Sequence, residues 1–312
     1  MAELLSGIPS YILAIAATAA IYAILCLGLN IIWGLAGLIN LGMVGFFAVG
    51  AYASAIATVT FKLPILAGLI TAMLVTGAVS AVVTIATLRL RGDYLAIVTL
   101  GFAELVRLVA NNESWLANGS DGISNIPGPW RSEVSAGVYN LIFFGIAMTA
   151  LALCYLLAER LRASPFGRAL RAIREDEDVA AAAGKPLLAF KLKAFITGSM
   201  MLGLAGALYA HFVSYFSPEN VRPLLTIYIF LALTLGGTAN NRGAVAGAFL
   251  LMIFLEGSRF LGHTVPGLKI VQVAALREIL IGLLLILVMR LRPQGIFPEP
   301  LPRFRAKPET TT

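Results

Sequence analysis

Long runs of apolar residues that carry no charge dominate the pattern of the chain. Residues 4–61 contain no Asp, Glu, Lys or Arg, and shorter uncharged runs follow at 63–88, 134–158, 194–218 and 223–241. About 20 apolar residues in a helix are enough to cross the hydrocarbon core of a bilayer. The pattern therefore predicts an all-α polytopic membrane protein with about nine (8–10) transmembrane helices. The predicted crossings lie at about 10–33, 42–61, 65–88, 94–110, 138–158, 192–212, 223–239, 243–262 and 270–289.

One stretch, residues 28–52, permits two interpretations. Six glycines interrupt it, and Asn30 and Asn40 lie within it. It could be two helices joined by a tight turn, or it could be a broken or re-entrant element that adds a crossing and moves the N-terminus to the other side. Irregular backbone is tolerated at membrane depth only where it is buried in protein or lines a cavity. The sequence does not choose between the two interpretations.

The overall composition and the position of the charges agree with a membrane protein. Hydrophobic residues make up 59% of the chain and charged residues only 12%, against about 25% charged in soluble domains. The formal net charge of +7 would suggest a nucleic-acid partner in a soluble protein, but residues 159–193 and 290–312 each carry a net charge of +3 and so hold most of it. Positive charge marks cytoplasmic loops. We therefore expect a cytoplasmic loop at 159–193, a cytoplasmic tail at 290–312, an external loop at 111–137 and no nucleic-acid partner.

The loop at 159–193 has the pattern of two short helices. Ser164-Pro165 is a typical helix start, and Phe166, Leu170 and Ile173 form an apolar stripe beside three arginines. An acidic run, Glu175–Asp178, then precedes an alanine-rich segment that ends at Gly184, and acidic residues favour a helix N-terminus. The loop could lie on anionic lipid as an amphipathic helix, or it could dock on a cytoplasmic partner and transmit force.

Catalytic motifs are missing from the sequence. Around Gly184-Lys185 the chain lacks the earlier glycine and the Ser/Thr of a phosphate-binding loop, so any ATP hydrolysis would belong to another chain. Two cysteines inside apolar runs and two histidines give no spacing typical of a metal site. We therefore expect no enzyme activity, no metal and no cofactor.

Polar residues inside the predicted crossings are candidates for the solute path. Glu104 and Arg107 stand three residues apart on one face of a predicted helix, and ionisable side chains at this depth must face protein or water. They could form a structural ion pair, or Glu104 could line the path. Asn30, Asn40 and Thr99 are the other candidates.

With these features in hand, the chain resembles the M-type (LivM-type) permease subunits of branched-chain amino-acid ABC importers over nearly its full length. The resemblance rests on several ordered passages. They are residues 28–52 (GLNIIWGLAGLINLGMVGFFAVGAY), 89–109 (RLRGDYLAIVTLGFAELVRLV), 119–127 (GSDGISNIP), 164–183 (SPFGRALRAIREDEDVAAAA), 203–210 (GLAGALYA) and 292–297 (RPQGIF). The chain departs from the family pattern at Ala239 and Ala244, where a glycine and a proline are usual.

The resemblance implies one transmembrane permease domain over 1–312, in the inner (plasma) membrane of a prokaryote, with a cytoplasmic C-terminus. The implied partners are a homologous H-type permease, two cytoplasmic ATPase subunits and an extracytoplasmic substrate-binding protein. The implied solutes are branched-chain or related neutral amino acids; a urea or short-chain amide importer and a motor-independent secondary carrier are the alternatives. Residues expected to couple to the ATPase are Glu175, Asp176, Glu177, Asp178, Ala181, Ala182 and Gly184.

Overall fold

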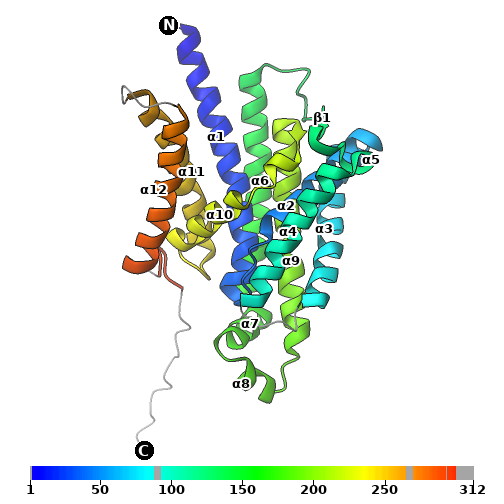
Figure 1. Ribbon diagram of the computed structural model, residues 1–312, viewed down its shortest axis with the longest axis vertical. Coiled ribbons are helices and arrows are strands. Elements are labelled where there is room, and N and C mark those ends of the chain that lie inside the picture. Colours follow the sequence, from blue (N-terminus) through cyan, green and yellow to red (C-terminus); the bar gives the residue numbers. More distant parts are fainter. Residues whose placement is uncertain (1, 88–92, 265–269, 293, 300–312) are drawn as a thin grey trace, which may run out of the picture.

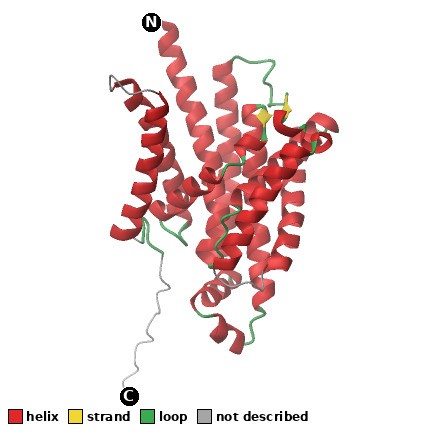
Figure 2. Ribbon diagram, viewed as in Figure 1, coloured by secondary structure: helices red, strands yellow, loops and turns green. Residues whose placement is uncertain are grey.

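The computed structural model describes residues 2–87, 93–264, 270–292 and 294–299, and most of this part of the chain is helical (Figures 1 and 2). The helices before the loop at 159–193 are α1 (Ala2–Leu29), α2 (Met43–Ala55), α3 (Ile65–Thr87), α4 (Asp93–Asn112), α5 (Ser114–Ala117) and α6 (Ala136–Ala163). The loop forms α7 (Pro165–Glu175) and α8 (Glu177–Ala182), and α9 (Leu187–Val213), α10 (Pro223–Gly236), α11 (Asn241–Thr264) and α12 (Ile270–Leu291) follow.

The membrane class is confirmed, whereas the predicted total of nine crossings is not. Within the described residues, six helical segments are long and apolar enough to cross a membrane. They are Pro9–Leu35, Met43–Thr60, Ile65–Thr87, Tyr94–Asn112, Ala136–Ala163 and Leu187–Val213. The predicted crossing at 223–239 is shorter than expected, because α10 has only 14 residues. At 1.5 Å per residue it spans about 21 Å, less than the ~30 Å of a hydrocarbon core.

Two ends of the helical assembly can be told apart (Figure 1). One end carries α7 and α8. The other carries a two-stranded antiparallel sheet, in which β1 (Ile123–Ser124) pairs with β2 (Tyr215–Phe216). We call them the α7–α8 end and the strand end. The pair β1–β2 is the one departure from all-α structure among the described residues, and it ties the loop at 111–137 to the segment after α9.

The ambiguous stretch 28–52 consists of two helices with a non-helical link. A π-helical turn, η1 (Asn30–Leu35), extends α1, and regular helix resumes only at Met43. The N-terminal end of α1 lies at the strand end, opposite α7 and α8 (Figure 1), as the two-helix interpretation predicts. A second π-helical turn, η2 (Ile56–Thr60), extends α2.

Helix α9 forms the centre of the assembly and packs against α1, α2 and α3. Glycines allow the backbones to approach closely, as is common between membrane helices. A Cβ on Gly50 of α2 would lie 2.2 Å from the carbonyl oxygen of Gly203, and one on Gly206 would lie 1.9 Å from that of Phe47. The sequence passage 203–210 is thus a packing surface for α2.

Candidate functional site

Helix α7 begins and packs as its sequence predicts. The hydroxyl of Ser164 accepts a hydrogen bond from the Gly167 N–H at 3.2 Å, which satisfies one of the free donors of a helix start. Leu170 and Ile173 are buried. Phe166 stacks on Phe190 of α9 with ring centroids 5.3 Å apart. The apolar stripe therefore holds α7 against the rest of the protein.

The second predicted helix of this loop is α8. Its N-cap is Asp176, whose Oδ1 accepts hydrogen bonds from the N–H groups of Asp178 at 2.9 Å and Val179 at 3.0 Å. Gly184 follows with φ +74°, the left-handed conformation that commonly ends a helix. The structure thus confirms two short helices in the loop.

Most of α8 is turned away from the protein. Ala180 is its one buried residue, and Val179 is 65% exposed. Glu177 is half-buried and forms an ion pair with Lys191 of α9, which anchors the start of α8. The other predicted coupling residues are exposed: Glu175, Asp176, Asp178, Ala181, Ala182 and Gly184. These exposed residues form a small surface of alanine and acidic side chains at the α7–α8 end, where a partner protein has access to it.

Arg174, near the end of α7, connects this helix to η1 and to the segment around Glu299. Its guanidinium donates to the carbonyl oxygen of Gly34 and to the carboxylates of Glu175 at 2.7 Å and Glu299 at 2.8 Å. Burial disfavours the charged form, but the two carboxylates outweigh it and raise the pKa of Arg174 above its usual value. Gly37 leaves room for this side chain, since a Cβ there would lie 2.7 Å from the Arg174 Cγ.

Asn30, a candidate path residue, is fully buried at the start of the π-helical turn. Its Oδ1 accepts from the Ala239 N–H at 2.8 Å, and its Nδ2 donates to Asn241 Oδ1 at 3.0 Å. Asn241 in turn donates to Glu159. In this conformation Asn30 joins α1 to the turn between α10 and α11; a role in the path stays a prediction. Ala239, where the family usually has glycine, adopts φ +61°, a conformation that glycine takes without strain.

A segment near the C-terminus completes the α7–α8 end. The N–H groups of Ile296 and Phe297 donate to the carbonyl oxygens of Leu235 and Gly236, each at 2.9 Å. These carbonyls belong to the last turn of α10, which has no helical partners for them. Gly237 (φ +119°) and Gly295 (φ +68°) let the two backbones touch. Of the predicted tail 290–312, residues 293 and 300–312 lie outside the described part.

Asn40 and Thr99 fix the link between η1 and α2. Thr99 Oγ1 accepts from the Leu41 N–H at 3.1 Å, and Asn40 Oδ1 accepts from the Gly42 N–H at 3.0 Å. Both side chains are fully buried. They satisfy backbone donors of irregular structure at membrane depth, which would otherwise cost several kcal/mol each. Their proposed exposure to a solute stays a prediction.

Glu104 has a different environment. It forms an ion pair with Arg107, in which Nε and Oε2 are 2.9 Å apart, and its side chain is 45% exposed. A second pair, Glu219–Arg222, lies before α10, and Arg107 interacts electrostatically with Glu219. We call Glu104, Arg107, Glu219 and Arg222 the charge cluster. Such residues need protein or water beside them, so this surface is not expected to face lipid tails.

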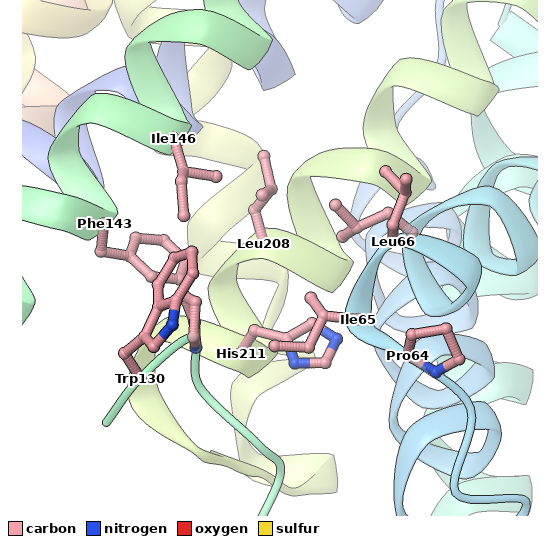
Figure 3. Close-up of a pocket in the computed structure, with 10 residues that line it drawn as sticks. Pro64, Ile65, Leu66, Trp130, Phe143, Ile146, Leu208 and His211 are labelled. Carbon is pink, nitrogen blue, oxygen red and sulfur yellow. The ribbon is translucent and has the colours of Figure 1, made fainter. Parts of the chain in front are cut away.

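At the strand end, His211 joins two helices and a loop. Its Nε2 lies 2.8 Å from Ser54 Oγ of α2 and its Nδ1 lies 2.7 Å from the Pro127 carbonyl oxygen. Figure 3 shows His211 beside an apolar cavity of about 520 Å³ between the start of α3, the loop around Trp130, α6 and α9. Sequence reasoning missed His211, because the two histidines were considered only in excluding a metal site. A histidine inside an apolar run also signals a buried hydrogen-bonding position, and that is the role seen here.

Comparison with known proteins gives consistent matches. Residues 11–289 match the family model described as the permease component of the branched-chain amino acid transport system. The chain is 33% identical to the high-affinity branched-chain amino acid transport system permease proteins LivM of Salmonella typhimurium and Escherichia coli, over 94% of this chain and 71% of theirs. It is 29% identical to a probable LivM of Methanocaldococcus jannaschii, over 89% of this chain and 91% of that one. No solved structure matches the chain significantly.

Proposed function

Because the chain belongs to the family of branched-chain amino acid transport system permease components, we propose that it is the M-type permease subunit of an ATP-driven importer. Its solutes would be branched-chain or related neutral amino acids, the class named in its relatives. The single observation that supports dependence on a separate motor is α8, a capped helix beyond the membrane-spanning helices in which four of the six residues are exposed. Surface loops held on a rigid scaffold often carry binding functions.

The proposed complex contains a homologous H-type permease, two ATPase subunits on α7 and α8, and a binding protein at the strand end. The α7–α8 end would then face the cytoplasm, in agreement with its positive charge. The motor would move α8 and α7, and Arg174 would pass that displacement to η1 and to the segment around Glu299. Alternating access would result from the shift of α1 and α10 relative to α9.

Co-purification tests this proposal. The tagged chain, extracted from its native membrane in mild detergent, should bring with it a second permease and two ATPases, whose ATPase activity rises with a liganded binding protein. A lone oligomer that transports in liposomes without ATP would contradict the proposal and support a secondary carrier. If urea or a short amide, but no amino acid, stimulates the ATPase activity of the complex, the proposed solute class is wrong, whereas the proposed importer function still holds.

Replacing Glu104 with Gln distinguishes the importer from an ion-driven carrier. In an importer driven by ATP, Glu104 has no proton to carry. Glu104→Gln is therefore expected to lower uptake by about fivefold or less, through the loss of one exposed ion pair worth ~1 kcal/mol at most. Uptake driven by a proton gradient would instead be abolished in this variant. Transport in proteoliposomes, with ATP or a pH gradient as the sole energy source, measures both.

Replacing Arg174 with Gln should weaken coupling. The variant loses charge-assisted hydrogen bonds to Gly34, Glu175 and Glu299, and such bonds contribute about 1.5–3 kcal/mol each. Uptake per ATP hydrolysed is expected to fall by about tenfold. Arg171→Gln, which makes the same change one turn earlier in α7, is the matched control. Equal coupling ratios in the two variants would contradict the role assigned to Arg174.

A further inference from the structure

A small cavity lies where α1, α2, α9 and the start of α10 meet. Its volume is about 170 Å³. Apolar and aromatic side chains form most of its wall, and charged and amide groups stand at one side. The lining consists of Tyr22, Phe47, Tyr209, Glu219, Asn220, Arg222, Leu224, Leu225 and Tyr228.

The apolar part of the wall is held in place by aromatic packing. The rings of Phe47 and Tyr209 have centroids 5.6 Å apart, and Phe47 also packs on Phe216 of β2 at 5.8 Å. Leu224 and Leu225 from the first turn of α10 complete it. A cavity of about 150 Å³ holds benzene, so this one has room for the four-carbon side chain of Leu or Ile.

The polar side of the cavity presents both signs of charge. Glu219 and Arg222 form an ion pair, and their side chains remain 69% and 68% exposed. The hydrogen bond from Arg222 holds the pKa of Glu219 below its usual value, so the carboxylate is ionised at neutral pH. A zwitterion carries the complementary pair of charges, and an Arg guanidinium matches a carboxylate with two parallel hydrogen bonds.

The start of α10 lies at the same place. Arg222 is its N-cap and makes no side-chain capping hydrogen bond, and Leu224 and Leu225 in the first turn line the cavity. The N-terminus of a helix carries about half a positive charge. Half-length membrane helices commonly direct this end at an anionic group of the solute in transporters, and α10 is too short to cross a bilayer.

We propose that this cavity binds the solute in transit, and that the solute is a neutral α-amino acid with an apolar side chain. The carboxylate contacts Arg222 and the N-terminal end of α10, the ammonium contacts Glu219, and the side chain packs between Phe47 and Leu225. This inference rests on the proposed function and deepens it. Arg107, in the charge cluster, interacts electrostatically with Glu219 at the polar side of the cavity.

The test uses the complete complex in proteoliposomes, with ATP inside, saturating binding protein and radiolabelled leucine. Arg222→Gln and Glu219→Gln are each expected to lower leucine uptake by about tenfold or more. Arg290→Gln, an equivalent change in the last turn of α12, is the control and should transport like the wild type. Exchanging the pair, Glu219→Arg with Arg222→Glu, keeps an ion pair. It should not restore uptake, because the carboxylate of the solute would then meet the carboxylate introduced at position 222, at the start of α10.

A size variant provides a readout that is independent of folding. Leu225→Phe narrows the cavity, and we expect the ratio of leucine to valine uptake to fall by about tenfold, the lower end of the effect of one methylene in an apolar pocket. The ratio is taken within one preparation, so a loss of protein cancels. A wild-type complex that imports no amino acid would overturn the proposed function itself. The cavity proposal alone would be overturned by either of two results in a complex whose wild type imports leucine. One is wild-type behaviour of both Arg222→Gln and Leu225→Phe. The other is rescue of uptake by the exchanged pair.

Discussion

Gly206→Val is expected to prevent the protein from folding. Gly206 lies in the middle of α9 at its contact with α2, where a Cβ would stand 1.9 Å from the Phe47 carbonyl oxygen and 3.1 Å from the Ala51 nitrogen. Both atoms belong to the backbone of α2, so no side-chain rotation can relieve the overlap. Overpacking by a methylene costs about 1–3 kcal/mol where side chains adjust, and the cost here lies above that range. Gly50 and Gly203 would lose contact at the same interface.

The measurement is the fraction of detergent-extracted protein that elutes as a single species in size-exclusion chromatography. Gly145→Val supplies the matched control, since Gly145 lies mid-helix in α6 and a Cβ there meets nothing within 4 Å. We expect the control to elute like the wild type and Gly206→Val to be recovered only as aggregate. A stable, monodisperse Gly206→Val protein would show that α2 and α9 can separate without loss of the fold.

Ala182→Glu is expected to abolish transport while the protein still folds. Ala182 is exposed in α8, so the free subunit tolerates the larger side chain. At an interface with the ATPase the added carboxylate would be buried without a partner. An uncompensated buried charge costs about 3 kcal/mol or more, which corresponds to roughly a hundredfold loss of productive docking.

Two readouts separate docking from folding for this variant. ATPase stimulation by the liganded binding protein should disappear, whereas the yield and elution profile of the permease should match the wild type. Ala182→Ser adds a polar group without bulk or charge and should retain most of the stimulation. Normal substrate-stimulated hydrolysis in Ala182→Glu would show that α8 is not the element that the motor contacts.

The positions of the helices can be predicted from local sequence patterns. The uncharged runs place the long helices within a few residues, and Ser164-Pro165 and Asp176 mark the starts of α7 and α8. The end of α10 at Gly236 is three residues earlier than predicted, because Gly237 takes a φ of +119° that breaks the helix and admits the Phe297 backbone. The number of membrane crossings depends on such details, and hydropathy alone does not supply them.

The contacts between distant segments could not be predicted. Arg174 was one of three arginines beside an apolar stripe, and nothing local distinguishes it; its partners Gly34 and Glu299 are 140 and 125 residues away. Asn30 and Thr99 stood out as polar residues in apolar surroundings, but their hydrogen bonds go to irregular backbone that the sequence could not place. The charge cluster likewise combines α4 with the segment before α10.

The hydrogen bonds from Ile296 and Phe297 to the last turn of α10 also constrain biogenesis. Chains emerge from the ribosome N-terminus first, so α10 enters the membrane well before residues 294–297 have been made. Until then the Leu235 and Gly236 carbonyls lack the partners that the finished protein gives them, and unsatisfied backbone groups are costly in lipid. The half-helix at the centre of the transport proposal therefore gains its last hydrogen bonds only after α12 has been made.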